Sequence, residues 1–303
     1  MFDIIGDVHG HADELEALLI KLGYQENNGT YNNPGRTIIF IGDYIDRGPK
    51  IRETLRIVKS MVDSNNAIAL MGNHEYNALC FHTMKKEGGY LRKHNIKNIC
   101  QHFETLKQFK GFESEWQEYL KWFKSLPLFY ENDFFRAVHA CWDINEIEIL
   151  KRTLVENCLT DELVLASTIK GTPFHNAVET TLKGKEIAMP EGLFFFDKDQ
   201  HKRSEIRIKW WEDPKTVSMQ SYSVVKIESL PTQPITDAHI LSNKFYDSSE
   251  KMVFFGHYWF DGIPEKMKDN VICTDYSVAR GGILVAFQYD VLDFSYLIHI
   301  ILS

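Results

Sequence analysis

Cysteine is scarce in this chain of 303 residues, and its pattern argues against two kinds of protein. The five cysteines are odd in number, widely scattered and without a CxxC pair: Cys80, Cys100, Cys141, Cys158 and Cys273. Such usage disfavours a disulfide framework and a zinc site built on cysteine. We therefore expect reduced thiols and a cytoplasmic protein.

The sequence also lacks the long apolar runs of a membrane protein and the excess of basic charge of a protein that coats nucleic acid. No uninterrupted apolar run reaches the roughly 18 residues that a membrane-spanning helix needs. Strand-like sequence begins at Met1 and Phe2, which leaves no room for a signal peptide. The net charge of −8 argues against nonspecific nucleic-acid binding. We expect neither a membrane nor nonspecific nucleic acid as a partner.

Internal repeats, low-complexity tracts and a convincing interdomain linker are also missing from the sequence. The composition is 44% hydrophobic and 25% charged, which is typical of a globular protein with a large buried core. We therefore expect a single domain over residues 1–303. Within it, residues 75–130 or so are predicted to form a mostly helical excursion. Residues 184–235 or so are predicted to form a polar segment that contains a hairpin with a charged tip around Asp199 and Gln200.

What the sequence does contain is a series of short apolar runs that stop abruptly at glycine and polar residues. These runs are typical of buried strands that open into loops, and they occupy residues 1–10, 37–48, 67–75, 135–140 and 252–259. Amphipathic helical patterns fill residues 11–23 and 51–64. The alternation predicts an α/β protein with its function in the loops beyond the strand ends.

Polar residues of similar type gather at these strand ends. They are Asp7, His9, Asp43, Asp46, Arg47, Asn73, His74, His139 and His257. Asp7 and His9 stand two residues apart, so on an extended segment both side chains point the same way. Carboxylate, imidazole and amide oxygen together suit Mn²⁺, Fe²⁺ or Zn²⁺, and one carboxylate can bridge two such ions. Alone, each of these residues fits a turn, a helix cap or a core histidine; together they predict a metal centre.

The motifs GDVHG, GDYIDRG and GNHE, followed by VHA and GH, resemble those of the calcineurin-like metallophosphoesterases in both type and order. GDYIDRG with GNHE is similar to the phosphoprotein phosphatase branch, which includes bacterial phosphatases and diadenosine tetraphosphate hydrolases. The motifs span residues 6–258. The resemblance implies a central β-sandwich flanked by helices, with a dinuclear metal centre at the strand ends.

The resemblance also implies a role for each motif residue. Asp7 and His9 would hold the first metal ion and Asp43 would bridge both. Asn73, which would also face the substrate, would complete the second site with His139 and His257. The two divalent ions are expected to be manganese, with iron or zinc as alternatives.

His74 would be the general acid that protonates the leaving group, and Asp46 would hold its imidazole. Arg47 would bind the phosphate oxygens, for which a planar fork of donors is suited. A hydroxide bridging the two metal ions would be the nucleophile, so no phosphoenzyme is expected.

We expect an enzyme that hydrolyses phosphoesters, in the first place a phosphomonoesterase of the serine/threonine protein phosphatase type. The alternative is a hydrolase of dinucleoside polyphosphates, so the partner would be a phosphorylated protein or a nucleotide substrate. A noncatalytic phosphate-binding scaffold is the third possibility, although every ligand of the motifs is present.

The second phosphate-binding arginine of the eukaryotic phosphatases has no matching motif here. Arg203, Arg207 and Arg280 are candidates to replace it. Arg203 and Arg207 lie in a basic stretch, residues 198–209, and four residues apart on one strand they would face the same side as substrate-binding groups. The alternative for this stretch is a solvated hairpin whose charges protect a sheet edge.

The other histidines and the tryptophans of the chain are less informative. His82, His94 and His102 lie in the helical excursion at irregular spacing, and we expect none of them to be a ligand. Trp210 and Trp211 could either pack in the core or line a substrate pocket.

Overall fold

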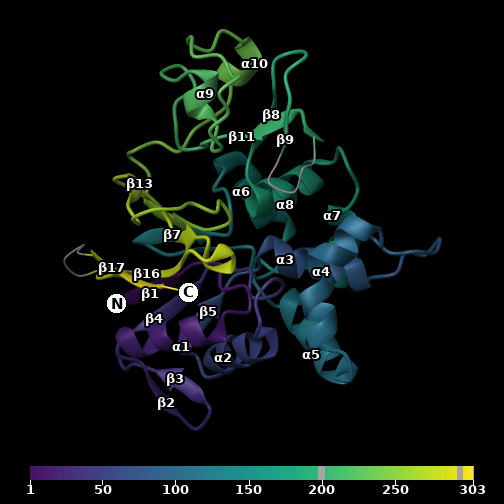
Figure 1. The fold of residues 1–303 in the computed structure, drawn as a ribbon, viewed down its shortest axis with the longest axis vertical. Coiled ribbons are helices and arrows are strands. Elements are labelled where there is room, and N and C mark those ends of the chain that lie inside the picture. The colour runs from purple at the N-terminus through teal and green to yellow at the C-terminus, as the bar shows by residue number, and fades with distance from the viewer. Residues whose placement is uncertain (197–201, 292–295, 303) are drawn as a thin grey trace.

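The computed structural model describes residues 1–196, 202–291 and 296–302. Its centre is a pair of β-sheets with helices around them (Figure 1). The first sheet, sheet 1, consists of β1 (Phe2–Ile5), β4 (Thr37–Phe40), β5 (Ala67–Ala69), β15 (Asp275–Tyr276), β16 (Ile283–Tyr289) and β17 (Tyr296–Leu302). The second, sheet 2, consists of β6 (Phe129–Glu131), β7 (Phe135–Val138), β12 (Met252–Phe255), β13 (Lys266–Lys268) and β14 (Val271–Cys273).

Each sheet contains three neighbouring parallel strands. In sheet 1, β4 pairs in parallel with β1 and with β5, while β16 is antiparallel to β1. In sheet 2, β12 pairs in parallel with β7 and with β14. The carboxyl ends of parallel neighbours point to the same edge, so the loops that follow β1, β4 and β5 emerge together, as do those after β7 and β12.

An apolar layer joins the two sheets. It contains Ile4, Ile39 and Leu70 from the sheet 1 side and Phe135 and Phe254 from sheet 2, all fully buried. The rings of Phe135 and Phe254 meet edge to face, with centroids 5.5 Å apart. The predicted α/β fold with a central β-sandwich is therefore confirmed.

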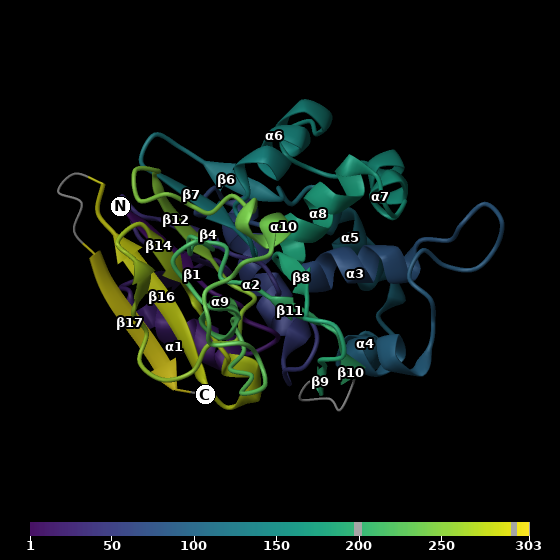
Figure 2. The same ribbon diagram turned by 90° about the horizontal axis from the view of Figure 1, so that it is seen from above.

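Helices cover the sandwich on several sides (Figure 2). α1 (Ala12–Lys21) packs on β16 and β17, and α2 (Ile51–Asp63) packs on β5. The segment predicted as a helical excursion contains α3 (Asn73–His82), α4 (Ile96–Gln108) and α5 (Glu113–Lys124). Each helix in the described part of the chain is too short or too polar to cross a lipid bilayer.

The sequence patterns did not reveal the helices between β7 and β8. These are α6 (Ile144–Thr153), α7 (Asp161–Ser167) and α8 (Pro173–Lys183), of which α6 and α8 pack on each other. A small hairpin of β2 (Gln25–Asn27) and β3 (Thr30–Asn32) follows α1. A 3₁₀ turn, η1 (Val278–Arg280), precedes β16.

The polar segment forms a small unit at the top of Figure 1, above the sheets. It contains β8 (Glu186–Ala188), β9 (Phe195–Phe196), β10 (Lys202–Arg203), β11 (Glu205–Arg207), α9 (Met219–Tyr222) and α10 (Ala238–Leu241). Its apolar residues form a separate cluster that includes Ile206, Ile208 and Tyr222. The predicted hairpin corresponds to the pairing of β9 with β10, and its charged tip around Asp199 and Gln200 lies outside the described residues.

Candidate metal and substrate site

The Asp43 carboxylate lies at the centre of the polar loops. Its Oδ2 is 3.5 Å from Nε2 of His9 and 4.0 Å from Nε2 of His74, and its Oδ1 is 3.5 Å from Nε2 of His139. Two groups of potential ligands therefore share Asp43: one with His9 and His74, the other with His139 and His257. Within each group the ligand atoms lie within 4.8 Å of one another. This is the arrangement that a bridging carboxylate between two ions requires.

Asn73 and Asp7 border this cluster. Oδ1 of Asn73 lies 3.1 Å from Nε2 of His139. The Asp7 carboxylate belongs to neither three-residue group, but its Oδ2 accepts a hydrogen bond of 3.0 Å from the backbone N–H of His257. Thus all six residues predicted as metal ligands come together from five separate strand ends.

Several buried ring nitrogens and one carboxylate oxygen in the cluster have no hydrogen-bond partner within the described parts of the chain. They are Nε2 of His9, Nδ1 and Nε2 of His257, and Oδ1 of Asp7. Native proteins rarely leave such atoms unpaired, because burial without a partner costs about 1–3 kcal/mol for each group. The donor set of carboxylate, imidazole and amide oxygen fits divalent ions of the manganese, iron or zinc type.

The protonation states of the cluster residues also fit a site for divalent ions. Nδ1 of His9 donates to the carbonyl of Ile45 over 2.9 Å, so in the neutral ring Nε2 keeps its lone pair toward the Asp43 carboxylate. Burial lowers the pKa of His9 to about 3, which keeps the ring neutral. Burial also raises the pKa of Asp7, and the neighbouring charges of Asp275 and Asp43 raise it further. A cation between these groups would relieve both the facing lone pairs and the crowded negative charge.

Glycine precedes several of the cluster residues for a steric reason. A Cβ atom at Gly72 would lie 2.2 Å from Oδ1 of Asp43, and a Cβ atom at Gly256 would lie 2.1 Å from Oδ1 of Asp7. Real Cβ atoms do not approach other atoms so closely, so any larger residue there would displace a carboxylate of the cluster. The glycines of GNHE and GH therefore make room for the acids of other motifs.

The backbone of the site is bent into the left-handed region at non-glycine residues. Asp43, Asp46, Arg47 and His257 have φ angles of 56°, 67°, 68° and 74°. Such conformations cost of the order of 1–3 kcal/mol each and persist only where the surroundings hold them. Here the side chains of Asp43 and His257 lie in the cluster, Asp46 lies against His74, and Arg47 lies against Trp259.

Glu75 is a buried residue of the site to which the sequence patterns assigned no role. Its carboxylate accepts backbone N–H groups of the Asp43 loop and of Gly72: Asp43 at 2.9 Å, Tyr44 at 2.8 Å, Ile45 at 3.3 Å and Gly72 at 3.0 Å. Glu75 therefore ties the loop after β4 to the start of α3. Its place as the acid of GNHE, at the third position of a helix, was the available signal.

The pair predicted for proton transfer is in contact. Nδ1 of His74 lies 2.5 Å from Oδ2 of Asp46, and both side chains are almost fully buried. Burial works to lower the pKa of His74, but the charges of Asp43 and Asp46 outweigh it and the pKa is raised. Since the Asp46 carboxylate accepts at Nδ1, Nε2 of His74 is the nitrogen that faces Asp43 and the cluster.

Three further side chains lie beside the cluster. The guanidinium carbons of Arg47 and Arg280 lie 4.4 and 4.0 Å from the centroid of the Trp259 ring. The same indole is 5.6 Å from the ring of His9, centroid to centroid. The backbone N–H of Trp259 donates to Asp275 over 2.7 Å, which holds the residue at its φ of 56°. The fold thus brings Arg280, more than 200 residues away in the sequence, to the same indole as Arg47.

Arg203 and Arg207 do not share a strand face, contrary to our expectation. β10 ends at Arg203 and pairs with β9, whereas β11 carries Arg207 and pairs with β8. Arg203 is exposed. Arg207 lies over the Tyr258 ring at 5.6 Å, and its charge helps burial to lower the pKa of His257. Of the two, only Arg207 is placed beside the predicted metal ligands.

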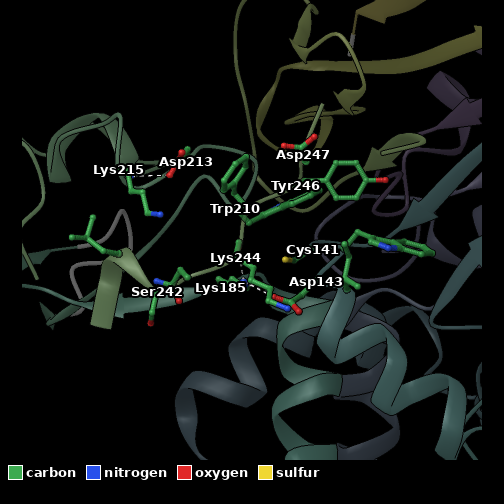
Figure 3. Close-up of a pocket in the computed structure, with 15 residues that line it drawn as sticks. Cys141, Asp143, Lys185, Trp210, Asp213, Lys215, Ser242, Lys244, Tyr246 and Asp247 are labelled. Atoms are coloured by element: carbon green, nitrogen blue, oxygen red, sulfur yellow. Dashed lines mark hydrogen bonds and ion pairs between the residues drawn. The ribbon is translucent and has the colours of Figure 1, made fainter. Parts of the chain in front are cut away.

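Trp210 and Trp211 are both buried. Trp210 donates from Nε1 to the carbonyl of Ala140 over 3.1 Å and also lines a cavity of about 440 Å³ (Figure 3). Cys141 and Lys185 line the same cavity. None of the predicted metal ligands is among its described lining residues, so this cavity is separate from the cluster.

Comparison with known proteins places the motifs in a family. The family model described as calcineurin-like phosphoesterase matches residues 1–258. The chain is 51% identical over 74 residues to an asymmetrical bis(5'-nucleosyl)-tetraphosphatase of Halalkalibacterium halodurans, a stretch that covers 24% of this chain and 30% of that protein. A similar relative in Oceanobacillus iheyensis is 39% identical over 109 residues, 36% of this chain and 42% of that protein. The chain thus spans less than half of the length of these two relatives.

One relative aligns over nearly its full length. The symmetrical bis(5'-nucleosyl)-tetraphosphatase of Vibrio campbellii is 24% identical over 307 residues, which cover 95% of this chain and 94% of that protein. Among solved structures, a protein serine/threonine phosphatase from Saccharomyces cerevisiae aligns with a TM-score of 0.43 and 13% identity, over 100% of this chain and 79% of that one.

The geometry predicts that Asp43→Asn weakens both ion sites at once, because the carboxylate is common to both groups. We expect Mn²⁺ binding to the chelated protein, measured by titration calorimetry, to fall below two ions per chain. We expect kcat/KM to fall by more than about 10²-fold, since a bound ion contributes several kcal/mol to the transition state.

Asp161→Asn is the matched control, because Asp161 is an exposed acid at the start of α7. It should keep the ion stoichiometry and the turnover of the unaltered protein. An Asp43→Asn protein that works like wild type after exhaustive chelation would exclude the shared-carboxylate centre.

Proposed function

The chain belongs to the calcineurin-like phosphoesterase family, and on that premise we propose that it hydrolyses the phosphoanhydride bonds of dinucleoside polyphosphates. The phosphomonoesterase of the protein phosphatase type, which we expected first, becomes the weaker candidate. The relatives described above are named as bis(5'-nucleosyl)-tetraphosphatases, and this supports a nucleotide substrate.

The single observation that carries the proposal is the Arg47–Trp259–Arg280 group next to His9. A phosphomonoester needs one set of phosphate donors, whereas a polyphosphate chain carries charge on several neighbouring phosphates. Arg47 would bind the phosphate under attack and Arg280 the next one, each through the planar donor fork that suits phosphate oxygens. Contact with the same indole holds both guanidiniums beside His9.

The metal ligands of the proposal are Asp7, His9, Asp43, Asn73, His139 and His257, and Asn73 would also face the bound phosphate. Two divalent ions held there, manganese in the first place, would act as Lewis acids and activate a water molecule for attack on phosphorus. The buried nitrogens of His9 and His257 that have no hydrogen-bond partner among the described residues support this assignment.

His74 would move the proton. Its Nε2 faces the cluster, and the proton on this nitrogen would pass to the leaving phosphate oxygen as the P–O bond breaks. Asp46 would accept from Nδ1 throughout, so Nε2 carries a transferable proton only in the doubly protonated ring, the form that the raised pKa of His74 favours. Arg47 would keep the phosphate in line with this proton.

A substrate panel with added Mn²⁺ tests the function directly. The substrates are diadenosine tetraphosphate, a phosphoserine peptide and p-nitrophenyl phosphate, compared by kcat/KM. We expect the dinucleotide to exceed the peptide by at least about tenfold. A preference for the peptide would overturn the nucleotide assignment in favour of the protein phosphatase, and no hydrolysis of any substrate would favour a noncatalytic scaffold.

Removing the proposed general acid should matter most where the leaving group is poor. General acid–base groups contribute about 10²- to 10⁴-fold. His74→Asn should therefore lose more activity on the phosphoserine peptide than on p-nitrophenyl phosphate, whose phenolate leaves without a proton. Equal losses on the two esters would mean that His74 does not act as an acid.

Replacement of Arg280 should change the preference of the enzyme between substrates. Arg280→Gln removes the charge but keeps a hydrogen-bonding side chain of similar length. We expect the ratio of kcat/KM for diadenosine tetraphosphate to that for p-nitrophenyl phosphate to fall by about tenfold or more, the loss of one charge-assisted hydrogen bond.

Arg152→Gln is the control for this change, because Arg152 is an 80% exposed arginine on α6. It should leave the ratio as in wild type. If Arg280→Gln behaves like Arg152→Gln, Arg280 does not bind the polyphosphate chain.

A further inference from the structure

A line of buried polar side chains continues behind Asp46, on the side away from His74. Nδ1 of His102 lies 2.8 Å from Oδ1 of Asp46, while His74 occupies Oδ2. The hydroxyl of Thr105 donates to the same Oδ1 over 2.6 Å and accepts the backbone N–H of Asp46 over 3.0 Å. His102 and Thr105 are both on α4 and both buried. The carboxylate of Asp46 is therefore held from behind by a helix that carries none of the predicted ligands.

The line extends one step further into the helical excursion. Nε2 of His102 lies 3.3 Å from Nε2 of His82, and Nε1 of Trp116 donates to that same nitrogen of His82 over 3.1 Å. An indole N–H can only donate, so Nε2 of His82 must be an acceptor. α3, α4 and α5 each contribute a residue to this contact.

The ionised state of Asp46 is consistent with three hydrogen-bond donors around its carboxylate. Burial alone would raise the pKa of Asp46, but the hydrogen bonds from His102 and His74 outweigh it and the pKa lies far below its usual range. An ionised Asp46 can only accept, so both histidines must present an N–H to it at Nδ1. Of these two contacts, only the one with His74 belongs to the motif residues.

We propose that His102 is a positioning residue for the reaction. Its N–H on Oδ1 of Asp46 turns the carboxylate so that Oδ2 meets Nδ1 of His74, and Nε2 of His74 then points into the cluster. The inference rests on the proposed role of His74 as the general acid. It assigns to the inserted helices a part in proton transfer and not only in packing.

A simple packing role for His102 makes a different prediction. The ring lies against Phe81 and Trp116, with centroids 5.2 and 5.7 Å away, so its loss could loosen the site as a whole. Such loosening would slow the hydrolysis of every substrate to a similar degree. Loss of a positioned acid slows only those reactions whose leaving group needs a proton.

The test compares His102→Leu with His102→Asn. The two replacements have similar size, but the amide nitrogen of asparagine sits where Nδ1 of histidine was and can donate to Asp46, whereas leucine cannot. The readout is the ratio of kcat for the phosphoserine peptide to kcat for p-nitrophenyl phosphate. We expect His102→Leu to lower the ratio by about tenfold, a part of the roughly 10²- to 10⁴-fold of a general acid, and His102→Asn to restore most of it.

His94→Leu is the matched control in the same helical excursion. His94 stacks between Phe81 and Tyr90 and bonds to the carbonyl of Phe81, with no contact to Asp46 among the interactions of the described residues. Its replacement should leave the ratio as in wild type. If His102→Leu does not fold, as judged by thermal unfolding, His102→Gln takes its place, since its amide nitrogen corresponds to Nε2 and not to Nδ1.

The combination with His74→Asn separates this inference from the proposed function. If His102 acts through His74, His102→Leu should lower the ratio no further in the His74→Asn background. A lowered ratio in His74→Asn with a wild-type ratio in His102→Leu would overturn the role of His102 and leave the general acid in place. An unchanged ratio in His74→Asn would overturn both.

Discussion

The crowding of buried carboxylates is the constraint on which the rest of this site depends. Asp7, Asp43, Glu75 and Asp275 are each 3% exposed or less and influence one another's charge. Moving a carboxylate out of water costs several kcal/mol unless partners compensate. Glu75 is compensated by four backbone N–H groups and Asp275 by two, but Asp7 keeps an oxygen without a partner among the described residues. The remaining negative charge is what the proposed divalent ions would balance.

This constraint explains why the loops have such unusual local geometry. Acids from different strand ends can approach one another only where glycine leaves room, as at Gly72 and Gly256. The backbone must also accept left-handed conformations at Asp43 and His257, which few residues adopt readily. The cost is tolerated because each loop is held by a buried carboxylate: Glu75 accepts backbone N–H groups of the Asp43 loop, and Asp7 accepts the backbone N–H of His257. The strained backbone of the loops is thus possible because the β-sandwich beneath them is stable.

The two sides of the site come from different regions of the chain. On the acid side, α4 reaches Asp46 through His102 and Thr105, so the helices inserted after β5 support the residue next to the proposed proton donor. On the substrate side, the loops after β12 and β15 bring Trp259 and Arg280 to Arg47. Asp46 and Arg47 are neighbours in sequence, and their consecutive left-handed conformations direct one inward to the helices and the other outward to the indole. Variation of the inserted helices and of the C-terminal loops could therefore act on chemistry and on substrate choice separately.

The class of fold and the candidate ligands could be predicted from the sequence, because both depend on local patterns. Apolar runs that stop at glycine and an acid predict buried strands that end in functional loops, and the alternation with amphipathic helices predicts an α/β protein. Asp7, His9 and Asp43 could be selected in this way, since their motifs are short and their spacing matters within a few residues.

The helices α6 to α8 were missed, because their short and partly polar patterns do not stand out. The contacts of Glu75, His102 and Arg280 could be found only in the tertiary structure. Arg203 shows the converse, because four-residue spacing suggested a shared face that pairing with different strands removed. His102 lies 56 residues from Asp46, and no pattern in the sequence of the helical excursion distinguishes it from His94. Such contacts depend on how sheets and helices pack against one another, and packing is a property of the whole chain that no short stretch of sequence contains.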